Sequence, residues 1–181
     1  ELSYKNFINA IRTGSGLKST IETCTSYGKY HFTGHRDCDI VLSPEESKKH
    51  NKICPKCGSK LTIGVADRIE ELADRHEGYK RKNALPFVSL IPLHELIAVV
   101  YGMKQITSKK VWEIYNILIT NFGDEFKVLL DVSYEDLKKV IPEKMAKVII
   151  MNREDKLKIN PGADGMYGQV LLNKEDILKK Q

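Results

Sequence analysis

Four residues of metal-ligand type occur as two pairs with the same spacing. His35 and Cys38 form an H-x-x-C pair, and Cys54 and Cys57 form a C-x-x-C pair after fifteen intervening residues. Each pair can reach one ion from a single tight turn, and four nitrogen and sulfur ligands suit tetrahedral zinc with no open position. A closed site of this kind is structural, so the pattern predicts a zinc-stabilised fold rather than a reaction.

The turn chemistry is clearest at the second pair, where Pro55 restricts the backbone and Gly58 can take a positive φ. That conformation lets backbone N–H groups point at a thiolate sulfur. The three cysteines of the two pairs are therefore the firmest ligands, and His35 completes the set. The fourth position stays open at this point, because three other residues compete for it: His31, His50 and Cys24.

The chain has 181 residues, of which 41% are hydrophobic and 29% charged, a balance typical of a soluble globular protein. That length can hold one good core or two small ones. No apolar run is long enough to span a membrane, and no basic-then-apolar signal sequence opens the chain. We therefore expect a cytoplasmic protein whose four cysteines serve metal binding rather than two disulfides.

The net charge of +5 permits a nucleic-acid partner without requiring one, because acidic residues are interleaved with basic ones almost everywhere. One local basic cluster stands out: Lys80, Arg81 and Lys82, beside Tyr79. It is either a solvated loop or a loop that contacts DNA phosphates.

Residues 28–66 are expected to form a zinc ribbon with a helical insert. Strand-like segments flank the two metal-binding pairs: Tyr30 and Phe32, residues 39–42 and residues 61–65. Between them, Ser43, Pro44 and Glu46 have the spacing of a helix start with a capping box. A module of about forty residues buries too little apolar surface alone, so the metal supplies folding free energy.

Residues 1–27 contain a helix over residues 4–12, capped by Ser3, and a strand-like run over residues 17–22, with no core of their own. The stretch over residues 14–20 superficially resembles a phosphate-binding loop. Such a loop needs glycine directly before its lysine, where this chain has leucine, and a strand rather than a helix before the glycines. We interpret the glycines as a helix C-cap followed by a strand.

Residues 67–181 are mainly helical by their apolar spacing, beginning with a helix over residues 67–75. An almost entirely apolar helix over residues 93–101 must be buried. The next helix is capped by Ser108 and ends at Gly123. A second stripe on this helix is interpreted as core packing: Trp112, Tyr115 and Ile119.

Residues 133–150 have the pattern of a helix–hairpin–helix, a motif that binds the DNA backbone through a glycine-bearing turn. The turn here contains no glycine, and Glu143 would repel phosphate. The apolar spacing expected of two packed helices is present in this degenerate hairpin, while the features of the turn that would bind a DNA phosphate are weakened. Lys144 and Lys147 remain its candidate phosphate contacts.

The last part of the chain is expected to form a β-hairpin from residues 157–159 and 167–171, followed by a short polar helix over residues 174–180. The fold class is therefore α+β: a zinc-ribbon module followed by a mainly α-helical domain with a C-terminal β-hairpin. No catalytic constellation of known spacing occurs in the chain, and its best cysteines are committed to metal. The local chemistry favours a binding module.

Several long stretches carry a family resemblance: residues 28–38, the second cysteine pair with residues 61–75, residues 126–130 and residues 161–168. They resemble the endonuclease Q family of archaeal and bacterial DNA repair nucleases, which are also described as UvrD-like helicases or PHP-domain proteins. The resemblance runs over nearly the whole chain. The helicase description has no support, because the chain has no phosphate-binding loop.

The resemblance implies an N-terminal PHP domain with a catalytic metal cluster, a zinc-binding domain and a C-terminal helical domain. It also implies cleavage of DNA on the 5′ side of deaminated bases such as uracil and hypoxanthine. Residues 1–27 would then be the last helix and strand of the PHP domain, and the four paired residues the family's zinc ligands. Tyr167 and Gly168 lie in a matching tail motif that can contribute to DNA or domain contacts. None of the family's catalytic residues has a counterpart in this chain.

The first hypothesis is that the chain is a noncatalytic part of a DNA lesion endonuclease, with structural zinc and contacts to DNA phosphates. The alternative is a zinc-ribbon module that binds a protein partner without DNA affinity, through the helix over residues 93–101 and the Trp112 stripe. A third hypothesis, an intact enzyme with a catalytic metal, needs a ligand position open to water, which a four-ligand site excludes.

Overall fold

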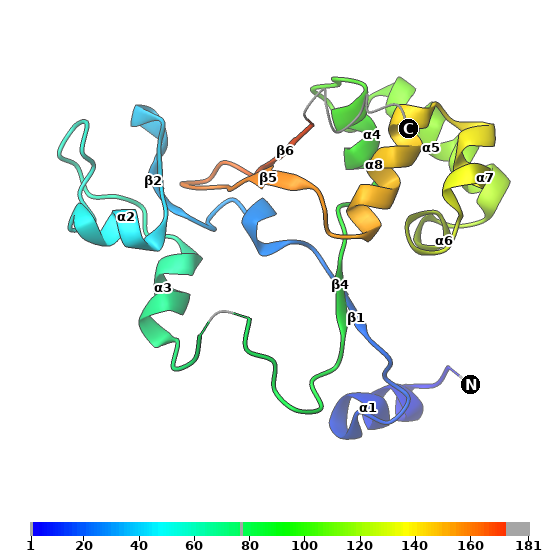
Figure 1. Ribbon diagram of the computed structural model, residues 1–181, viewed down its shortest axis with the longest axis horizontal. Coiled ribbons are helices and arrows are strands. Elements are labelled where there is room, and N and C mark those ends of the chain that lie inside the picture. The colour runs from blue at the N-terminus through cyan, green and yellow to red at the C-terminus, as the bar shows by residue number, and fades with distance from the viewer. Residues whose placement is uncertain (1, 77, 173–181) are drawn as a thin grey trace.

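The chain folds into two bodies at the ends of an elongated molecule, with a β-hairpin reaching from one to the other (Figure 1). The computed structural model describes residues 2–76 and 78–172. One end holds the short strands and helices around the paired cysteines, and the other end holds a group of packed helices. The α+β class expected from the sequence is confirmed, with a small zinc-ribbon-like module followed by a mainly helical part and a C-terminal hairpin.

Local capping signals explain where the first helices begin and end. Ser3 accepts a backbone hydrogen bond at the start of α1 (Tyr4–Thr13), and Gly14 ends that helix in the left-handed conformation. This confirms that the first glycine of the loop-like stretch is a helix C-cap. The capping box that begins at Ser43 is complete on α2 (Pro44–Lys49).

The strands form three two-stranded sheets in the part of the chain that the structure describes. The pairs are β1 (Thr20–Glu22) parallel to β4 (Phe87–Ser89), β2 (Thr33–His35) antiparallel to β3 (Ile40–Leu42), and β5 (Lys158–Asn160) antiparallel to β6 (Gln169–Leu171). The hairpin expected near the C-terminus is confirmed. The strand expected at Tyr30 and Phe32 begins later, because β2 starts at Thr33. Two 3-10 turns join this set: η1 (Thr25–Tyr27) and η2 (Arg36–Cys38).

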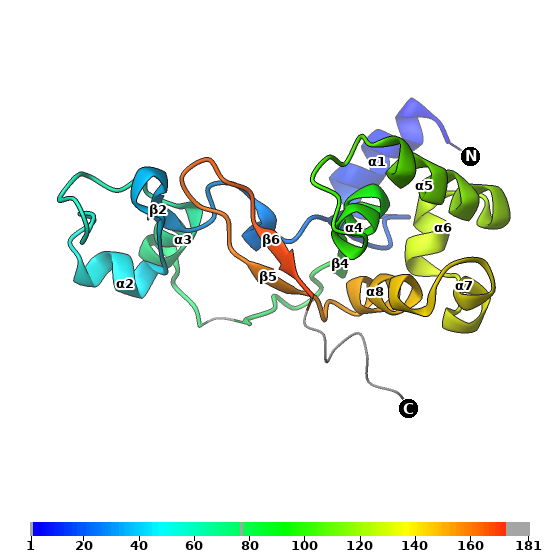
Figure 2. The ribbon, with the colours of Figure 1, turned by 90° about the horizontal axis from the view of Figure 1, so that it is seen from above.

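Five helices form the helical body: α4 (Leu93–Val100), α5 (Lys109–Phe122), α6 (Glu125–Leu130), α7 (Tyr134–Val140) and α8 (Glu143–Arg153). Buried apolar side chains from all five make one continuous core. The side chains of Leu93, Leu96 and Ile97 are fully buried, which confirms the burial expected for the apolar run. Both views place α8 between the hairpin and α7 (Figures 1 and 2).

Two neighbouring side chains of α8 hold this body together through backbone groups. The buried Asn152 amide accepts from the Ile91 N–H at 3.0 Å and donates to the Ile91 carbonyl at 3.1 Å. The Arg153 guanidinium donates to three carbonyls at the end of α6: Val128, Leu129 and Val132. Burial lowers the pKa of Arg153. The end of α8 is therefore tied to the start of α4 and the end of α6.

The strand expected over residues 61–65 is not formed. Thr62 makes only an isolated bridge to β2, and Gly64 begins α3 (Val65–Leu72) instead. A Cβ on Gly64 would lie 2.3 Å from the Phe32 carbonyl carbon, so the chain can pass this closely only as glycine. The expected helix after the zinc module thus begins and ends earlier than its apolar spacing indicated.

The second stripe on α5 belongs only partly to the core. Tyr115 and Ile119 pack half-buried against it, as expected, but Trp112 is 41% exposed. The apolar side chains Leu93, Leu96, Ile97, Ala98 and Val100 of α4 lie inside the helical body, so they are not exposed for a protein partner as the alternative hypothesis required. The polar helix expected over residues 174–180 lies outside the described residues.

Two helices outside the helical body, α1 and α3, carry apolar side chains that are exposed. On α1 they include Tyr4, Phe7 and Ile11, and on α3 they include Val65, Ile69 and Leu72. Neither helix contributes to the core of the helical body. Within residues 2–76 and 78–172, no helix combines the length and apolar character needed to cross a bilayer.

Candidate metal centre

Each of the four paired residues is positioned by a short element. His35 ends β2, and Cys38 ends η2, which follows directly. Cys54 and Cys57 lie in the turn beyond α2. The antiparallel pairing of β2 with β3 sets His35 opposite Ile40, and the bridge from β2 to Thr62 brings the second turn against the first.

Both turns close with a residue in the left-handed conformation. Gly58 has φ +74°, as its sequence position predicted, and its N–H donates to the Cys54 carbonyl at 2.9 Å. Asp39 takes the equivalent place after the first pair with φ +54°, and its N–H donates to the Arg36 carbonyl at 3.0 Å. The first knuckle therefore ends in the same left-handed conformation without a glycine, since aspartate tolerates this region better than most residues. Its closing hydrogen bond differs, because it returns to Arg36 rather than to the first ligand, His35.

The four side chains converge on one point. One ligand atom from each of His35, Cys38, Cys54 and Cys57 lies within 4.8 Å of the others, and the His35 Nδ1 lies 3.4 Å from the Cys57 sulfur. A tetrahedral zinc with bonds of about 2.0 Å to nitrogen and 2.3 Å to sulfur holds its ligand atoms roughly 3.3–3.8 Å apart. The donor set and its spacing therefore fit a closed zinc site.

The sulfur atoms of the cluster differ in how readily they lose a proton. Hydrogen bonds from the Ser59 hydroxyl and backbone N–H lower the pKa of the Cys57 thiol to about 6. The neighbouring Cys57 sulfur and partial desolvation raise the pKa of Cys38 to about 11. Without metal the cluster therefore retains protons that a divalent ion would displace, which makes metal binding pH-dependent.

The three rivals for the fourth ligand position lie outside this cluster. The His31 ring stacks on Phe32 at a centroid distance of 4.8 Å, and burial lowers the pKa of His31. His50 is the C-cap of α2. The Cys24 sulfur lies 3.0 Å from the Ser26 hydroxyl. Among the described residues, the geometry therefore gathers His35 and the three cysteines of the two pairs.

The basic cluster beside Tyr79 borders a hollow. Lys80 and Arg81 line an open cavity of about 710 Å³ together with residues 83–89 and 153–155. Lys82 is exposed and is not among the lining residues. The cavity joins the linker before β4 to the end of α8, so two of the three predicted phosphate contacts face a concave surface. Their role in DNA binding stays a prediction.

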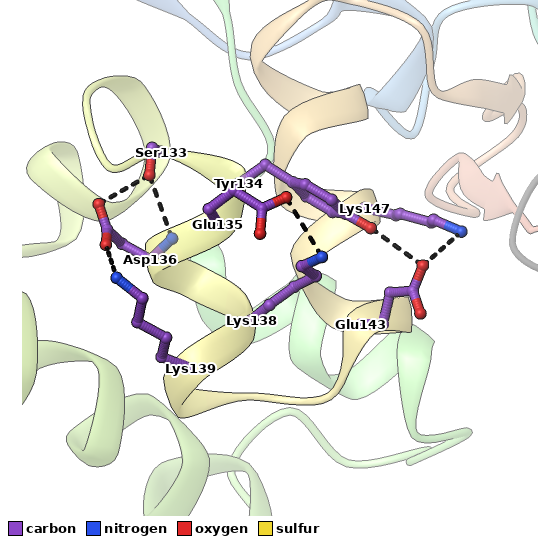
Figure 3. A network of polar contacts seen from close by, with 8 residues as sticks. All are labelled: Ser133, Tyr134, Glu135, Asp136, Lys138, Lys139, Glu143 and Lys147. Atoms are coloured by element: carbon purple, nitrogen blue, oxygen red, sulfur yellow. Dashed lines mark hydrogen bonds and ion pairs between the residues drawn. The ribbon is translucent and has the colours of Figure 1, made fainter. Parts of the chain in front are cut away.

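The lysines of the degenerate hairpin are engaged within the protein (Figure 3). The Lys147 ammonium lies 2.9 Å from the Glu143 carboxylate, which also accepts a hydrogen bond from the Tyr134 hydroxyl. Lys144 donates to the Val100 carbonyl at 3.2 Å. Lys138 and its neighbour pair with carboxylates on α7. To bind a DNA phosphate, Lys144 or Lys147 would have to give up its contact within the chain. Phosphate binding by these two lysines stays a prediction.

The two candidates in the tail lie at the far end of the β5–β6 hairpin. We call residues 161–168 the hairpin tip. Tyr167 is 65% exposed, whereas Gly168 is buried and donates to the Tyr27 carbonyl at 3.0 Å. The tip also places Asp164 on the first knuckle, where the Arg36 N–H donates to its carboxylate at 2.6 Å. Interpretation of the sequence missed this contact, because its partners are 128 positions apart.

Comparisons with known proteins identify relatives of this arrangement. A family model described as the MJ0043 C-terminal domain matches residues 92–156. The Methanocaldococcus jannaschii protein MJ0043 is 37% identical over 143 residues, which cover 79% of this chain and 18% of that protein. The Bacillus subtilis protein YqxK is 33% identical over 144 residues, which cover 79% of this chain and 33% of that protein.

Two solved structures share the fold over almost the whole chain. The lesion-specific endonuclease PfuEndoQ from Pyrococcus furiosus matches with a TM-score of 0.85 and 36% identity, over 99% of this chain and 44% of that one. An endonuclease Q in complex with a 27-mer duplex substrate, with an abasic lesion at its active site, matches with a TM-score of 0.84 and 35% identity, over 99% and 45%.

The resemblance predicted from the sequence is confirmed: the chain has the fold of part of endonuclease Q. The chain spans less than half the length of each of these relatives.

Proposed function

We propose that this chain is the noncatalytic, DNA-binding part of a DNA repair endonuclease of the endonuclease Q type, which acts on deaminated bases. The observation that carries the proposal is the match of 99% of the chain, at a TM-score of 0.85, to a lesion-specific endonuclease. A relative with the same fold holds a duplex with a lesion at its active site. Such a role implies a cytoplasmic location.

The metal in this proposal is a structural zinc held by His35, Cys38, Cys54 and Cys57. Four protein ligands leave no position for water, so the ion would supply folding free energy rather than a nucleophile. Its role is to hold the two knuckles together, because the small buried cluster of the zinc body contains only Leu42, Cys54 and Leu61. With so few buried side chains, this body needs the metal to stay folded.

DNA would be held through backbone phosphates at the concave surface beside Lys80 and Arg81. The cavity there is open and has room for a phosphodiester, and Arg153, whose guanidinium is bonded to the carbonyls at the end of α6, is among its lining residues. Glu154 and Asp155 also line it, which limits the net charge. We place the weaker candidates Lys144 and Lys147 second, because each already has a partner within the chain.

The partner of this chain would be an N-terminal PHP domain that carries the catalytic metals. Residues 1–27 would be its last helix and strand, which is consistent with the exposed apolar face of α1. The β1–β4 pair supports this view, because parallel strands are normally covered on both faces, and every residue of β1 is exposed. A domain packed on α1 and β1 would cover both.

Fluorescence anisotropy of the zinc-loaded chain with a labelled duplex, at low and moderate salt, tests the proposal. We expect binding whose affinity falls steeply with salt. The double variant K80Q/R81Q should bind several-fold more weakly and with a shallower salt slope. The double variant K109Q/K110Q removes the same charge from α5 and should bind like the unmodified chain.

Absence of binding at low salt would contradict the proposal that this part of the protein binds DNA. The alternative, a module that binds a protein partner, would then be favoured, with the exposed apolar faces of α1 and α3 as its surface.

A further inference from the structure

Two exposed tyrosines from distant parts of the chain share one lysine where the hairpin tip meets the zinc body. The Lys29 ammonium lies 5.5 Å from the centre of the Tyr30 ring and 5.8 Å from the centre of the Tyr167 ring. Tyr30 is 45% exposed and Tyr167 is 65% exposed. Each ring therefore keeps a large part of its surface open to solvent, although each also contacts the Lys29 ammonium.

A second cation lies at the same place. The Arg36 Nη1 and the Tyr30 hydroxyl oxygen each lie 3.7 Å from the point that a Cβ on Gly165 would occupy. Among the described residues, neither Lys29 nor Arg36 forms an ion pair. The Asp164 carboxylate accepts the Arg36 backbone N–H, and the Arg36 charge contributes to the lowered pKa of Asp164 without a direct ion pair. Both cations thus remain available to an anionic ligand.

The backbone segments that carry the two tyrosines are held in fixed relative positions. The Gly165 N–H donates to the Lys29 carbonyl at 3.0 Å, and the Phe32 N–H donates to the Gly162 carbonyl at 2.9 Å. A Cβ on Gly162 would lie 2.4 Å from the Gly28 carbonyl oxygen, and one on Gly168 would lie 2.5 Å from the Ser26 carbonyl oxygen. The two segments therefore touch backbone to backbone, which fixes the backbone of Tyr167 relative to that of Tyr30 before any ligand arrives, with Lys29 near both rings.

We infer that Tyr30, Tyr167 and Lys29 form a stacking site for an unpaired nucleobase, with Lys29 and Arg36 contacting the adjoining phosphates. Aromatic rings bind bases of any sequence through their faces, and cations beside the rings track the backbone. A paired base inside a duplex has no free face, so the site selects a base that has left the stack. The inference rests on the proposed function and adds to it the residues and the DNA structure that this surface recognises.

The test uses the whole zinc-loaded chain and two duplexes of one sequence, one fully paired and one with a single 2-aminopurine in a one-nucleotide bulge. We expect the chain to bind the bulged duplex more tightly and to quench the 2-aminopurine fluorescence by stacking. In the double variant Y30L/Y167L, affinity for the bulged duplex should fall roughly ten-fold. Its affinity for the paired duplex should change less than two-fold.

Three further variants separate stacking from other effects. Y30F/Y167F keeps both rings and should retain the preference and the quenching. K29M keeps the apolar stem and should weaken binding while leaving some quenching. Y4L removes a still more exposed tyrosine from α1 and should change neither quantity. Zinc content and circular dichroism show whether each variant is folded.

The outcomes distinguish this inference from the function on which it rests. Salt-dependent duplex binding with no bulge preference, or equal losses on both duplexes in Y30L/Y167L, would overturn the stacking site and leave the proposed function intact. Absence of binding to either duplex at low salt would overturn both. Loss of the bulge preference in Y30L/Y167L together with its retention in Y30F/Y167F would establish the site.

Discussion

The four converging side chains make the most specific prediction at the scale of single residues. C54S replaces one of the three sulfur ligands with a hydroxyl. Cys54 is only 1% exposed, so it is the ligand that lies deepest in the zinc body. We expect the variant to bind zinc substoichiometrically and the zinc body to unfold at a lower temperature than in the unmodified chain. Zinc content by elemental analysis and thermal unfolding would measure both effects.

The rival ligands provide the matched controls for this prediction. C24S and H50A should each retain one zinc per chain, because neither side chain lies in the cluster. H35A should lose zinc as C54S does. Full zinc retention in H35A, or its loss in C24S, would show that the fourth ligand has been assigned to the wrong residue.

Asn152 carries a second prediction at this scale. Its buried amide satisfies both the N–H and the carbonyl of Ile91, directly before α4. N152A leaves these two groups buried without partners, so we expect the free energy of unfolding to fall by about 2–5 kcal/mol. Urea unfolding followed by circular dichroism measures this. N121A on the exposed face of α5 is the control, and a loss of similar size there would contradict the argument.

At the scale of elements, the serine that caps α2 and the serine within it have opposite expected effects. The Ser47 hydroxyl is buried and has no hydrogen-bond partner among the described residues, whereas Ser43 caps the helix. S47A should stabilise the zinc body by about 1 kcal/mol, since it removes an unsatisfied polar group. S43A should destabilise it by about 1 kcal/mol. Thermal unfolding at saturating zinc measures both, and destabilisation by S47A would imply that its hydroxyl has a partner.

Features that are encoded by residues close together in the sequence were predictable from the sequence. The caps at Ser3, Ser43 and Gly123, and the two metal-binding pairs, are encoded within four or five positions, so their types and spacing suffice. α6 could not be predicted in this way, because a helix of six residues is too short to show a helical period. The strand expected over residues 61–65 was wrong because the close approach of Gly64 to Phe32 depends on tertiary structure.

Contacts over long sequence separation were beyond the reach of the sequence pattern. The Asn152–Ile91 pair is 61 positions apart, and the contact of Asp164 with Arg36 spans 128. The apolar faces of α1 and α3 illustrate a related difficulty. Helical spacing shows that such a face exists but does not say what covers it, and here both faces are exposed within the chain.

At the scale of the whole molecule, the two separate buried clusters predict a two-step response to metal removal. The core of the helical body contains none of the four candidate ligands, and the small cluster of the zinc body contains Cys54. A chelator should therefore unfold the zinc body while α4 to α8 stay folded. Hydrogen exchange should rise over residues 33–62 and remain slow over residues 93–153. Zinc should restore protection and magnesium should not, and loss of protection in both bodies would contradict independent folding.

The hairpin tip is the structural link between the two bodies, and Gly162 tests it. A Cβ there would lie 2.4 Å from the Gly28 carbonyl oxygen and 2.6 Å from the Met166 carbonyl oxygen, so G162A forces backbone atoms apart. We expect the tip to detach from the zinc body, because its hydrogen bonds to Ser26 and Phe32 need the same close approach. Hydrogen exchange should then accelerate at least ten-fold over residues 26–36 and 161–168, with the helical body unchanged.

The link also connects stability to recognition. If the tip positions Tyr167 beside Tyr30, G162A should lose the preference for bulged DNA even though both rings are intact, because pre-organisation of the rings is lost. Q169A, which changes an exposed side chain on β6 of the same hairpin, should keep both the protection and the preference. Retained preference in G162A despite faster exchange would show that the tyrosines act without a fixed tip. Unchanged exchange would show that the backbone contact does not join the two bodies.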